Sequence, residues 1–246
     1  MMFMKYLIIN GSPRRGNTWK AIEQVKKNLN GEFEEVHLIK KKIPMCNGCY
    51  NCFNDGEERC PHWDRINPII EKIRKCDGLI IASPVYAMNV PAVLKNFMDH
   101  VAYLYHRPEF FTKKAIIVVT TAGAGQKDVA KYIDETVRHW GVNKVYKVSI
   151  ACGGKDTLES DEIDKVSKKF QNDLESGKLH SPKFTDIIFY NAWKAMALAD
   201  EPIEADAKYW REKDLINKDF APEVKLNVIK KLFSKIMFVM MKRFIN

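Results

Sequence analysis

The sequence of 246 residues has little glycine and proline, no low-complexity tract and no visible internal repeat. It contains 12 Gly and 10 Pro, with 46% apolar and 29% charged residues. These proportions lie near the average for soluble globular proteins, which excludes fibrous and disordered classes. At about 150 residues per domain, the length predicts one large domain or one domain with an appendage.

Long hydrophobic runs are also absent. The apolar run from Phe3 to Ile9 stops at Asn10, too early for a secretory signal, and no small-residue cleavage site follows it. Near the other end, the longest uncharged apolar run is Ile236 to Met241. A membrane span needs about 18 such residues. We therefore expect a cytoplasmic protein, in which six cysteines do not form a disulfide framework.

The positive charge is not spread along the chain. The net charge is +9, but residues 224–246 contain six Lys or Arg residues and no acid. The remaining residues carry 34 basic against 31 acidic side chains and are nearly neutral. This distribution argues against a nucleic-acid partner.

Short β-branched apolar runs alternate with segments of helical periodicity. Strands are predicted at Lys5–Ile9, Phe33–Ile39, Gly78–Ala82, Ala115–Thr121 and Val145–Ala151. Helices are predicted at Thr18–Leu29, Asp64–Lys75, Pro91–Tyr103, Lys127–Trp140 and Asp161–Ser176, with Pro91 as a first helical residue. Several of these strands are apolar almost throughout, as in parallel sheets covered on both faces. We predict a doubly wound α/β domain over 1–180 and a helical extension over 181–246.

The loop from Asn10 to Thr18 joins the first strand to the first helix, where an open α/β sheet presents ligand sites. It is neither G-x-G-x-x-G nor Walker A. Polar side chains at Ser12, Asn17 and Thr18, together with a helix N-terminus, would hold one phosphate, and Arg14 would add a charge-assisted bond. The local alternative is an ordinary turn in which Asn17 or Thr18 caps the helix.

Two further loops follow the third and fourth strands, over residues 83–89 and 120–125. The switch-point rule directs all three loops toward one crevice. The first of the two carries Tyr86 and apolar residues, and the second is small and glycine-rich. Such loops can close over a flat ring while their backbone groups bind its edge, although ordinary strand-to-helix connections have the same composition.

In combination, GSPRRGNT, SPVY followed by KNFMDH, and TTAGAG resemble the flavodoxin-like NAD(P)H-dependent FMN reductase and iron–sulfur flavoprotein group over about residues 4–155. The resemblance implies a five-stranded flavodoxin-like sheet with bound FMN. It assigns the FMN phosphate to the first loop, at Ser12, Arg14, Gly16, Asn17 and Thr18. It assigns the isoalloxazine ring to the other two loops, at Pro84, Val85, Tyr86, Thr121, Ala122 and Gly123.

Four of the six cysteines crowd into residues 46–60, at Cys46, Cys49, Cys52 and Cys60. Three thiolates within seven residues and a fourth nearby fit the ligand spacing of an iron–sulfur cluster. The spacing resembles the compact motif of iron–sulfur flavoproteins, which bind a [4Fe–4S] cluster, but its last gap is long. Zinc, metal-free thiols or a redox pair of the first two cysteines stay open as alternatives. Cys76 and Cys152 lie outside this window, and we expect them in or near the core.

The six histidines show no H-x₃-H or H-E-x-x-H spacing, and no G-x-S-x-G follows a strand. Metal-dependent and serine hydrolysis are therefore disfavoured. His100 and His106 follow a predicted ring-contacting loop, but we expect them to be solvated surface residues rather than substrate contacts.

The tail at 224–246 is predicted to be a basic amphipathic helix. One face is apolar, with Leu226, Ile229, Leu232, Phe233, Ile236, Met237, Met240 and Phe244. The other face carries Asn227, Lys231, Ser234, Lys235 and Lys242, with Phe238 misplaced among them. Docking on the body or on a second subunit is favoured, and peripheral contact with an anionic membrane is the alternative. We expect a homo-oligomer.

The leading functional hypothesis is an oxidoreductase. FMN would accept hydride from NAD(P)H and pass electrons to a quinone, a flavin or an iron–sulfur acceptor. Because the cofactor performs the chemistry, no acid–base residue is predicted. The alternatives are an electron carrier without a dedicated substrate and a non-catalytic Cys₄ zinc protein with a membrane-binding tail.

Overall fold

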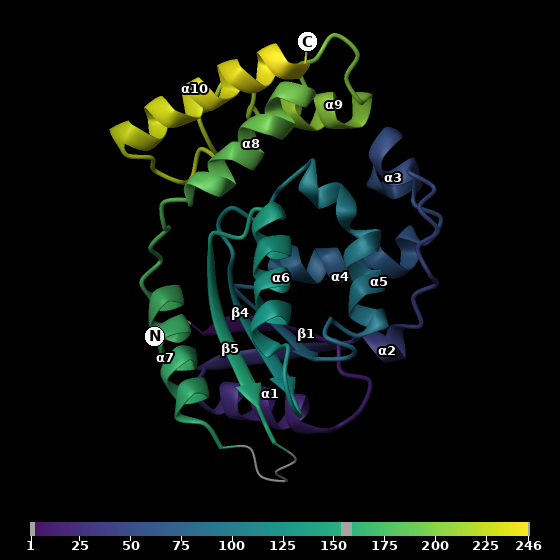
Figure 1. Ribbon diagram of the computed structural model, residues 1–246, viewed down its shortest axis with the longest axis vertical. Coiled ribbons are helices and arrows are strands. Elements are labelled where there is room, and N and C mark those ends of the chain that lie inside the picture. Colours follow the sequence, from purple (N-terminus) through teal and green to yellow (C-terminus); the bar gives the residue numbers. More distant parts are fainter. Residues whose placement is uncertain (1–2, 154–158, 246) are drawn as a thin grey trace.

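The computed structural model describes residues 3–153 and 159–245. The last residue of the predicted tail, 246, and the last two residues of the segment that resembles the flavoproteins, 154–155, lie outside the described residues. A five-stranded parallel sheet with the order β2-β1-β3-β4-β5 forms its centre (Figure 1). The strands are β1 (Met4–Asn10), β2 (Gly31–His37), β3 (Gly78–Pro84), β4 (Lys114–Thr121) and β5 (Lys144–Ala151). This order is flavodoxin-like and confirms the predicted fold class.

Helices connect the strands and continue beyond the last one. The helices of the sheet domain are α1 (Asn17–Lys27), α2 (Leu38–Lys41), α3 (Asn51–Asn54), α4 (Trp63–Lys75), α5 (Ala92–His100), α6 (Gln126–His139) and α7 (Asp161–Glu175). Two short 3₁₀ turns are η1 (Glu57–Arg59) and η2 (Ala102–Tyr105). The C-terminal extension contains α8 (Phe184–Met196), α9 (Glu204–Glu212) and α10 (Val228–Ile245).

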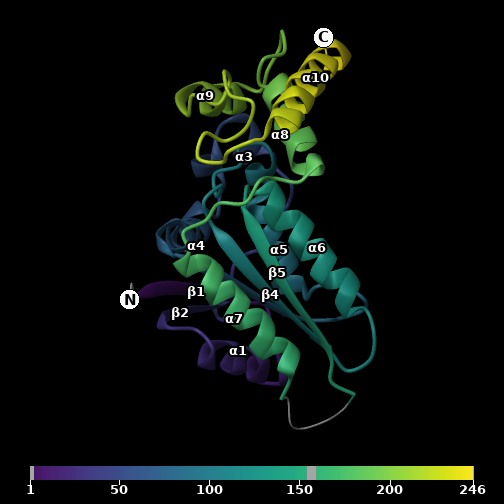
Figure 2. The same ribbon diagram turned by 90° about the vertical axis from the view of Figure 1, so that its left-hand side faces the viewer.

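Both faces of the sheet are covered, because successive strand residues point to opposite sides. Leu7, Ile81 and Ile117 pack in one core with residues of α4, α5 and α6. Their neighbours in the strands face a second core with residues of α1 and α7. Figure 2 shows α1 and α7 on one side of β4 and β5 and α6 on the other. Double burial explains why these strands lack a polar alternation.

The predicted elements differ from the observed ones mainly at their ends. The second strand was predicted to reach Ile39, but β2 ends at His37 and the chain turns into the short helix α2. Pro91 is the N-cap of α5 rather than its first residue. The segment predicted as one helix to Tyr103 leaves α5 after His100 and continues as the 3₁₀ turn η2. A shift of one or two residues in the end of a helix or strand does not alter the apolar periodicity of the sequence. The periodicity therefore cannot predict these ends.

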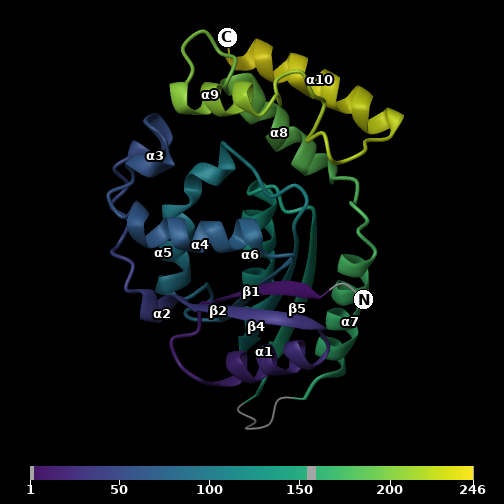
Figure 3. The same ribbon diagram turned by 180° about the vertical axis from the view of Figure 1, so that it is seen from behind.

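The helices of the extension lie beyond the amino-terminal ends of β4 and β5 (Figures 1 and 3). Phe111, just before β4, packs in a separate small core with Tyr190, Trp210 and Val224. Because the strands are parallel, the loops after β1, β3 and β4 lie at the opposite end of the sheet. The extension is therefore placed away from the three loops that the sequence singles out.

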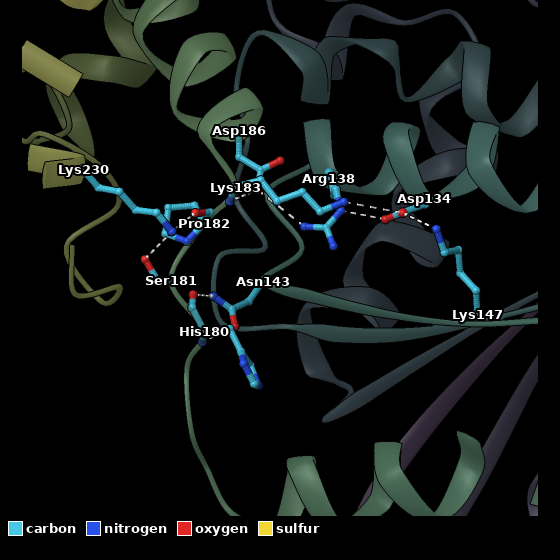
Figure 4. A network of polar contacts seen from close by, with 10 residues as sticks. All are labelled: Asp134, Arg138, Asn143, Lys147, His180, Ser181, Pro182, Lys183, Asp186 and Lys230. Carbon is cyan, nitrogen blue, oxygen red and sulfur yellow. Dashed lines mark hydrogen bonds and ion pairs between the residues drawn. The ribbon is translucent and has the colours of Figure 1, made fainter. Parts of the chain in front are cut away.

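Polar contacts join α6 and β5 to the chain that enters the extension (Figure 4). Asp134 on α6 accepts hydrogen bonds from Arg138 at 2.7 Å and Lys147 at 2.9 Å. Arg138 Nη1 also lies 3.5 Å from Asp186 at the start of α8. Further along, the Asn143 side chain donates to the carbonyl of His180 at 2.9 Å. A cavity of about 640 Å³ lies between α6 and α8 beside these contacts.

The tail docks on α8 through a face that shares Phe233 and Met237 with the predicted one but otherwise differs from it. Ser234, predicted to be solvated, is fully buried and accepts a 2.8 Å hydrogen bond from Asn191 of α8. Phe238, predicted as misplaced, lies in the same interface with its ring 4.5 Å from Lys194 Nζ. Ile229, in contrast, was predicted to dock and is 71% exposed. The assignment was wrong because α10 carries apolar residues on two faces, and a buried polar pair decides which one meets α8.

Within the described residues, none of the helices combines the length and apolarity that crossing a membrane requires.

Candidate functional site

Three loops meet at one edge of the sheet, where β1, β3 and β4 end. These strands are neighbours, and backbone hydrogen bonds continue the sheet into the loops. Gly11 N–H donates to the Ala82 carbonyl at 2.8 Å, and Val85 N–H donates to the Thr120 carbonyl at 2.9 Å. The loops 10–18, 83–89 and 120–125 therefore line the carboxyl edge, which is the usual ligand site of doubly wound sheets.

Helix α1 begins at the first loop without a side-chain cap. Its N-cap is Gly16, and no described side chain caps the helix, so the alternative with Asn17 or Thr18 as the cap is wrong. The amide groups of the first turn keep their capacity to donate. A Cβ on Gly16 would lie 3.9 Å from Arg14 Nε, so the guanidinium lies beside these donors. Uncapped amides next to a cation favour an anion such as phosphate.

The remaining polar side chains of the first loop make contacts within the protein. Ser12 is 4% exposed, and its hydroxyl donates to the Arg14 carbonyl at 2.8 Å. Thr18 is buried, and its hydroxyl lies 2.7 Å from the Thr120 hydroxyl of β4. Asn17 hydrogen-bonds the Cys152 thiol, which opposes the increase in the thiol's pKa caused by burial. These contacts hold the first loop against β4 and the residue after β5.

The loop after β3 turns sharply beside the first loop. Tyr86 and Asn89 exchange two backbone hydrogen bonds, of 2.8 and 2.9 Å. Ala87 and Met88 between them have positive φ angles of 47° and 62°. Tyr86 is 40% exposed, while Pro84 and Val85 are half-buried. The turn therefore presents an aromatic ring at this edge of the sheet.

The loop after β4 is held by its own threonine. The Thr121 hydroxyl donates to the Ala124 carbonyl at 2.9 Å and lies 3.2 Å from Gly123 N–H. Ala122 and Gly123 are exposed, and a Cβ on Gly123 would meet nothing within 4 Å. Gly125, with φ of 86°, lies against Met88 of the preceding loop. The residues predicted to contact a ring thus come from two loops that touch each other.

The second candidate site is a cavity of about 280 Å³ formed by the cysteine loop and α5. Its lining includes all four clustered cysteines and, from α5, Asp99 and His100. Among the described residues, no group of three or more Cys, His, Asp or Glu side chains is arranged to hold a metal ion. The fold therefore gathers the four thiols around one space without preassembling a ligand set.

Two thiols of this cavity, those of Cys52 and Cys60, are held in their protonated form. Burial, reinforced by the neighbouring Cys60, raises the pKa of Cys52 to about 11. Burial also raises the pKa of Cys60, with Cys49 and Cys46 acting in the same direction. Thiolate is the form that binds metals, so loading this site must release protons. Cys76 and Cys152 are each 5% exposed outside the cavity, as predicted.

Comparison with known proteins identifies the family. A family described as NADPH-dependent FMN reductase matches residues 4–152, more than half of the chain. The chain belongs to this family. An "Iron-sulfur flavoprotein" of Archaeoglobus fulgidus is 31% identical over 222 residues, which cover 87% of this chain and all of the relative. The "Iron-sulfur flavoprotein CD630_04720" of Clostridioides difficile is 30% identical and covers 85% of this chain and 98% of its own.

Solved structures show the same fold at lower identity. The NAD(P)H:quinone oxidoreductase of Methanothermobacter marburgensis covers 74% of this chain and 100% of its own, with a TM-score of 0.54 and 16% identity. RosB, solved with a flavin-phosphate intermediate, covers 92% of both chains with a TM-score of 0.53 and 15% identity. Family membership makes this chain a flavin-dependent NAD(P)H oxidoreductase.

Sequence reasoning missed Asn96, which anchors the cysteine loop to α5. Its side-chain oxygen accepts a 2.9 Å hydrogen bond from Cys46 N–H. Its amide nitrogen donates to the carbonyls of Ile43 and Pro44, at 3.2 and 3.0 Å. Asn96 lies within the KNFMDH segment and is 5% exposed. A polar residue on the buried side of an otherwise apolar helix was the available signal.

The two histidines expected at the surface are both enclosed, so that expectation was wrong. His100 is 3% exposed, with Nε2 2.8 Å from the Pro44 carbonyl and Nδ1 3.7 Å from Cys60 Sγ. The His106 ring stacks on Trp193 of α8 at 3.7 Å between centroids, and its Nδ1 lies 2.7 Å from Asp206. Both rings fill space that appears only when distant segments fold together.

Arg107 links the cysteine loop to the extension and was also missed. It is 3% exposed and donates to the backbone carbonyl of Cys52 and, at 3.4 Å, to that of Phe53. Its Nη1 lies 2.5 Å from Asp206 of α9, and its Nη2 lies 3.3 Å from Glu57. The partners come from two distant parts of the chain, the cysteine loop and α9, so no local motif predicts the cluster.

Proposed function

We propose that this oxidoreductase binds FMN at the three loops and holds an iron–sulfur cluster at the cysteine cavity. The convergence of the three loops beside the uncapped start of α1 is the observation that carries the flavin site. The FMN phosphate would be bound by Arg14 and by the backbone around Ser12, Gly16, Asn17 and Thr18. The side chain of Thr18 would act indirectly, because its hydroxyl already bonds Thr120.

The isoalloxazine ring would lie against the two touching loops. Pro84, Val85 and Tyr86 supply apolar and aromatic surface on one side. Thr121, Ala122 and Gly123 supply exposed backbone groups on the other, with open space above Gly123. An apolar slot with a few backbone donors and acceptors is typical of a flat-ring site.

The cysteine cavity suits a cluster by its donor set. Cys46, Cys49, Cys52 and Cys60 line one space, and soft thiolate ligands select iron–sulfur clusters or zinc. The relatives named iron–sulfur flavoproteins favour the [4Fe–4S] assignment over zinc. When bound, FMN would supply hydride chemistry with NAD(P)H, and the cluster would supply single-electron transfer toward a quinone, flavin or iron–sulfur acceptor. Asn96 and Arg107 hold the backbone of the cysteine loop in place for these ligands.

A visible spectrum with metal analysis of anaerobically purified protein tests both cofactors. We expect bound FMN, iron and acid-labile sulfide. Cys49→Ser should abolish iron and sulfide while FMN remains, and Cys152→Ser should leave all three. About one zinc per chain without sulfide would contradict the cluster assignment.

Ligand comparison tests the phosphate site separately. The double variant Arg14→Ala with Asn17→Ala removes a charge-assisted bond, which is worth about 1.5–3 kcal/mol. FMN affinity should fall by roughly 10- to 100-fold, while riboflavin, which lacks the phosphate, should bind nearly as before. Equal losses for both ligands would place the phosphate elsewhere.

A further inference from the structure

Helix α10 has a second apolar face that no described part of the protein covers. Its docked face meets α8 through Phe233, Ser234, Phe238 and their neighbours. The opposite side exposes Ile229, Leu232, Ile236 and Met240 by 71, 60, 49 and 58%. Their spacing of three and four residues makes a continuous stripe along the helix. This exposed stripe extends to Phe244, which is 89% exposed.

Positive charge borders the exposed stripe. Lys231, Lys235 and Lys242 are exposed and recur at intervals of four and seven residues, so they form a row along one side of it. Arg243 is exposed within the apolar stripe itself, between Leu232 and Ile236 around the helix. Within residues 3–153 and 159–245, the side chains of these four residues make no ion pair.

The charges argue against a second copy of this chain as the partner. If two copies paired through the exposed stripe, Arg243 would be buried at the contact and the lysine rows would meet each other. Residues 224–246 contain no acidic side chain to compensate. Burying an unpaired charge costs several kcal/mol.

We infer that α10 attaches the enzyme to the surface of a bilayer containing anionic phospholipids. The exposed stripe would enter the boundary between headgroups and acyl chains, as in interfacial amphipathic helices. Lys231, Lys235, Lys242 and Arg243 would reach the lipid phosphates with their long side chains. Because the three loops lie at the opposite end of the sheet, the flavin site would face away from the lipid (Figure 1). The inference is independent of the proposed cofactors.

Vesicle sedimentation of the full chain tests this inference. One set of vesicles contains phosphatidylcholine alone, and the other contains phosphatidylcholine and phosphatidylglycerol in equal parts. We expect the wild-type protein to bind only the anionic vesicles. Binding should weaken between about 0.01 M and 0.15 M salt, over which the screening length falls from about 30 to 8 Å.

Two variants separate the charge from the apolar stripe. Lys231→Gln with Lys235→Gln and Lys242→Gln should lower the partition coefficient about 100-fold, at about 1 kcal/mol per residue. Leu232→Gln with Ile236→Gln should lower it at least as much. The matched control, with Lys165, Lys168 and Lys169 of α7 changed to Gln, removes the same charge from exposed positions on another helix and should leave binding within about threefold. Far-ultraviolet circular dichroism and flavin content should be unchanged in all three.

Several results would overturn the inference. One is failure of the wild type to bind anionic vesicles at low salt, a measurement that requires no variant. Another is full binding by the Leu232→Gln, Ile236→Gln variant, which would show that the protein is attracted to the vesicles by charge alone. A third is a wild-type oligomer that ignores vesicles and dissociates in that variant. The exposed stripe would then be a subunit interface.

Discussion

The three loops at the carboxyl edge of the sheet take their positions from the strands that carry them, whereas the cysteine loop takes its position from side chains elsewhere. Gly11 and Val85 extend the hydrogen bonding of the sheet into the loops. The cysteine loop is instead held by Asn96 of α5 and by Arg107, which is itself paired with Asp206 of α9.

This difference has consequences for stability and function. The three loops depend on backbone hydrogen bonds that continue the sheet and on short side-chain contacts such as that between the Thr18 and Thr120 hydroxyls. The cysteine cavity depends on a few buried polar groups whose loss leaves partners unpaired. We therefore expect substitutions near the cysteine loop to affect the cluster and stability strongly while leaving the flavin site largely intact.

Arg107→Met should have the largest effect. It leaves the Asp206 carboxylate buried without its strongest partner, and removing one member of a buried pair costs about 3–5 kcal/mol. Urea unfolding should show this loss, and iron content should fall. FMN affinity of the folded fraction should stay within about threefold of wild type.

The matched control for this variant is Arg211→Met. Arg211 pairs with Glu204 on the same helix, α9, but its side chain is 54% exposed. Its loss should cost less than about 1 kcal/mol. If Arg107→Met reduced FMN affinity as strongly as iron content, the two regions would not be independent.

Asn96→Ala should have the next largest effect, because it removes the partners of Cys46 N–H and of two loop carbonyls. Leaving such groups unsatisfied costs about 1–3 kcal/mol. Hydrogen exchange of residues 43–52 should become faster, and exchange of the strands should follow only the global loss of stability. If exchange became faster by the same factor in residues 43–52 and in the strands, by more than the global loss of stability explains, Asn96 would support both regions equally.

Asp134→Asn tests the junction that connects the extension to the sheet. Burial acts to raise the pKa of Asp134, but the Lys147 hydrogen bond and the charge of Arg138 hold it below its ordinary value. A lowered pKa in the folded state means that the carboxylate stabilises the protein above about pH 4 and stops doing so as pH falls through the folded pKa. The variant should be about 1–2 kcal/mol less stable at pH 7.

The stability difference between wild type and Asp134→Asn should shrink below about pH 4, as followed by urea unfolding across pH. A difference that is constant with pH would mean that packing rather than charge explains the variant. If Asp134→Asn also lowered the iron content but left FMN bound, the cysteine loop would depend on this junction and the three loops at the carboxyl edge would not.

Gly125→Ala, in the loop after β4, should destabilise the protein no more than Asp134→Asn. Gly125 has φ of 86°, and a Cβ there would lie 3.1 Å from Met88, so a cost of about 1–2 kcal/mol is expected. Gly123→Ala is the matched variant, because its Cβ would meet no protein atom within 4 Å. It should leave stability unchanged and weaken FMN, whose ring is predicted to lie there. Unaltered FMN affinity in Gly123→Ala would remove this glycine from the proposed ring site.

Much of the fold could be predicted because the strands are buried on both faces. Continuous apolar runs such as Leu79 to Ala82 have few other interpretations in a chain with alternating helical segments. The three loops followed from the same pattern, since parallel strands end at the same edge. Local detail was less predictable. The cap at Gly16 and the end of β2 at His37 depend on backbone geometry that composition does not record.

The cysteine cluster was recognisable from its spacing, but the groups that hold its loop were not. His100, Arg107 and Asp206 are separated from the cysteines by tens of residues, and nothing in their local sequence marks them. Asn96 is marked only as a polar residue on the buried side of its helix. The docked face of α10 was also misassigned. The apolar periodicity of the tail cannot show that Ser234 forms a buried hydrogen bond with Asn191 of α8.

The sequence by itself determined the doubly wound α/β class, the positions of the three loops and the cysteine set, because each follows from short-range periodicity or spacing. Only the tertiary structure decided that His100 and Arg107 are buried, that the extension lies at the opposite end of the sheet from the three loops, and that α10 keeps one apolar face exposed. These features depend on polar partners brought together from distant segments. Burial of a polar group is favourable only once its partner has arrived, so the pairing exists in the folded chain and leaves no local trace in the sequence.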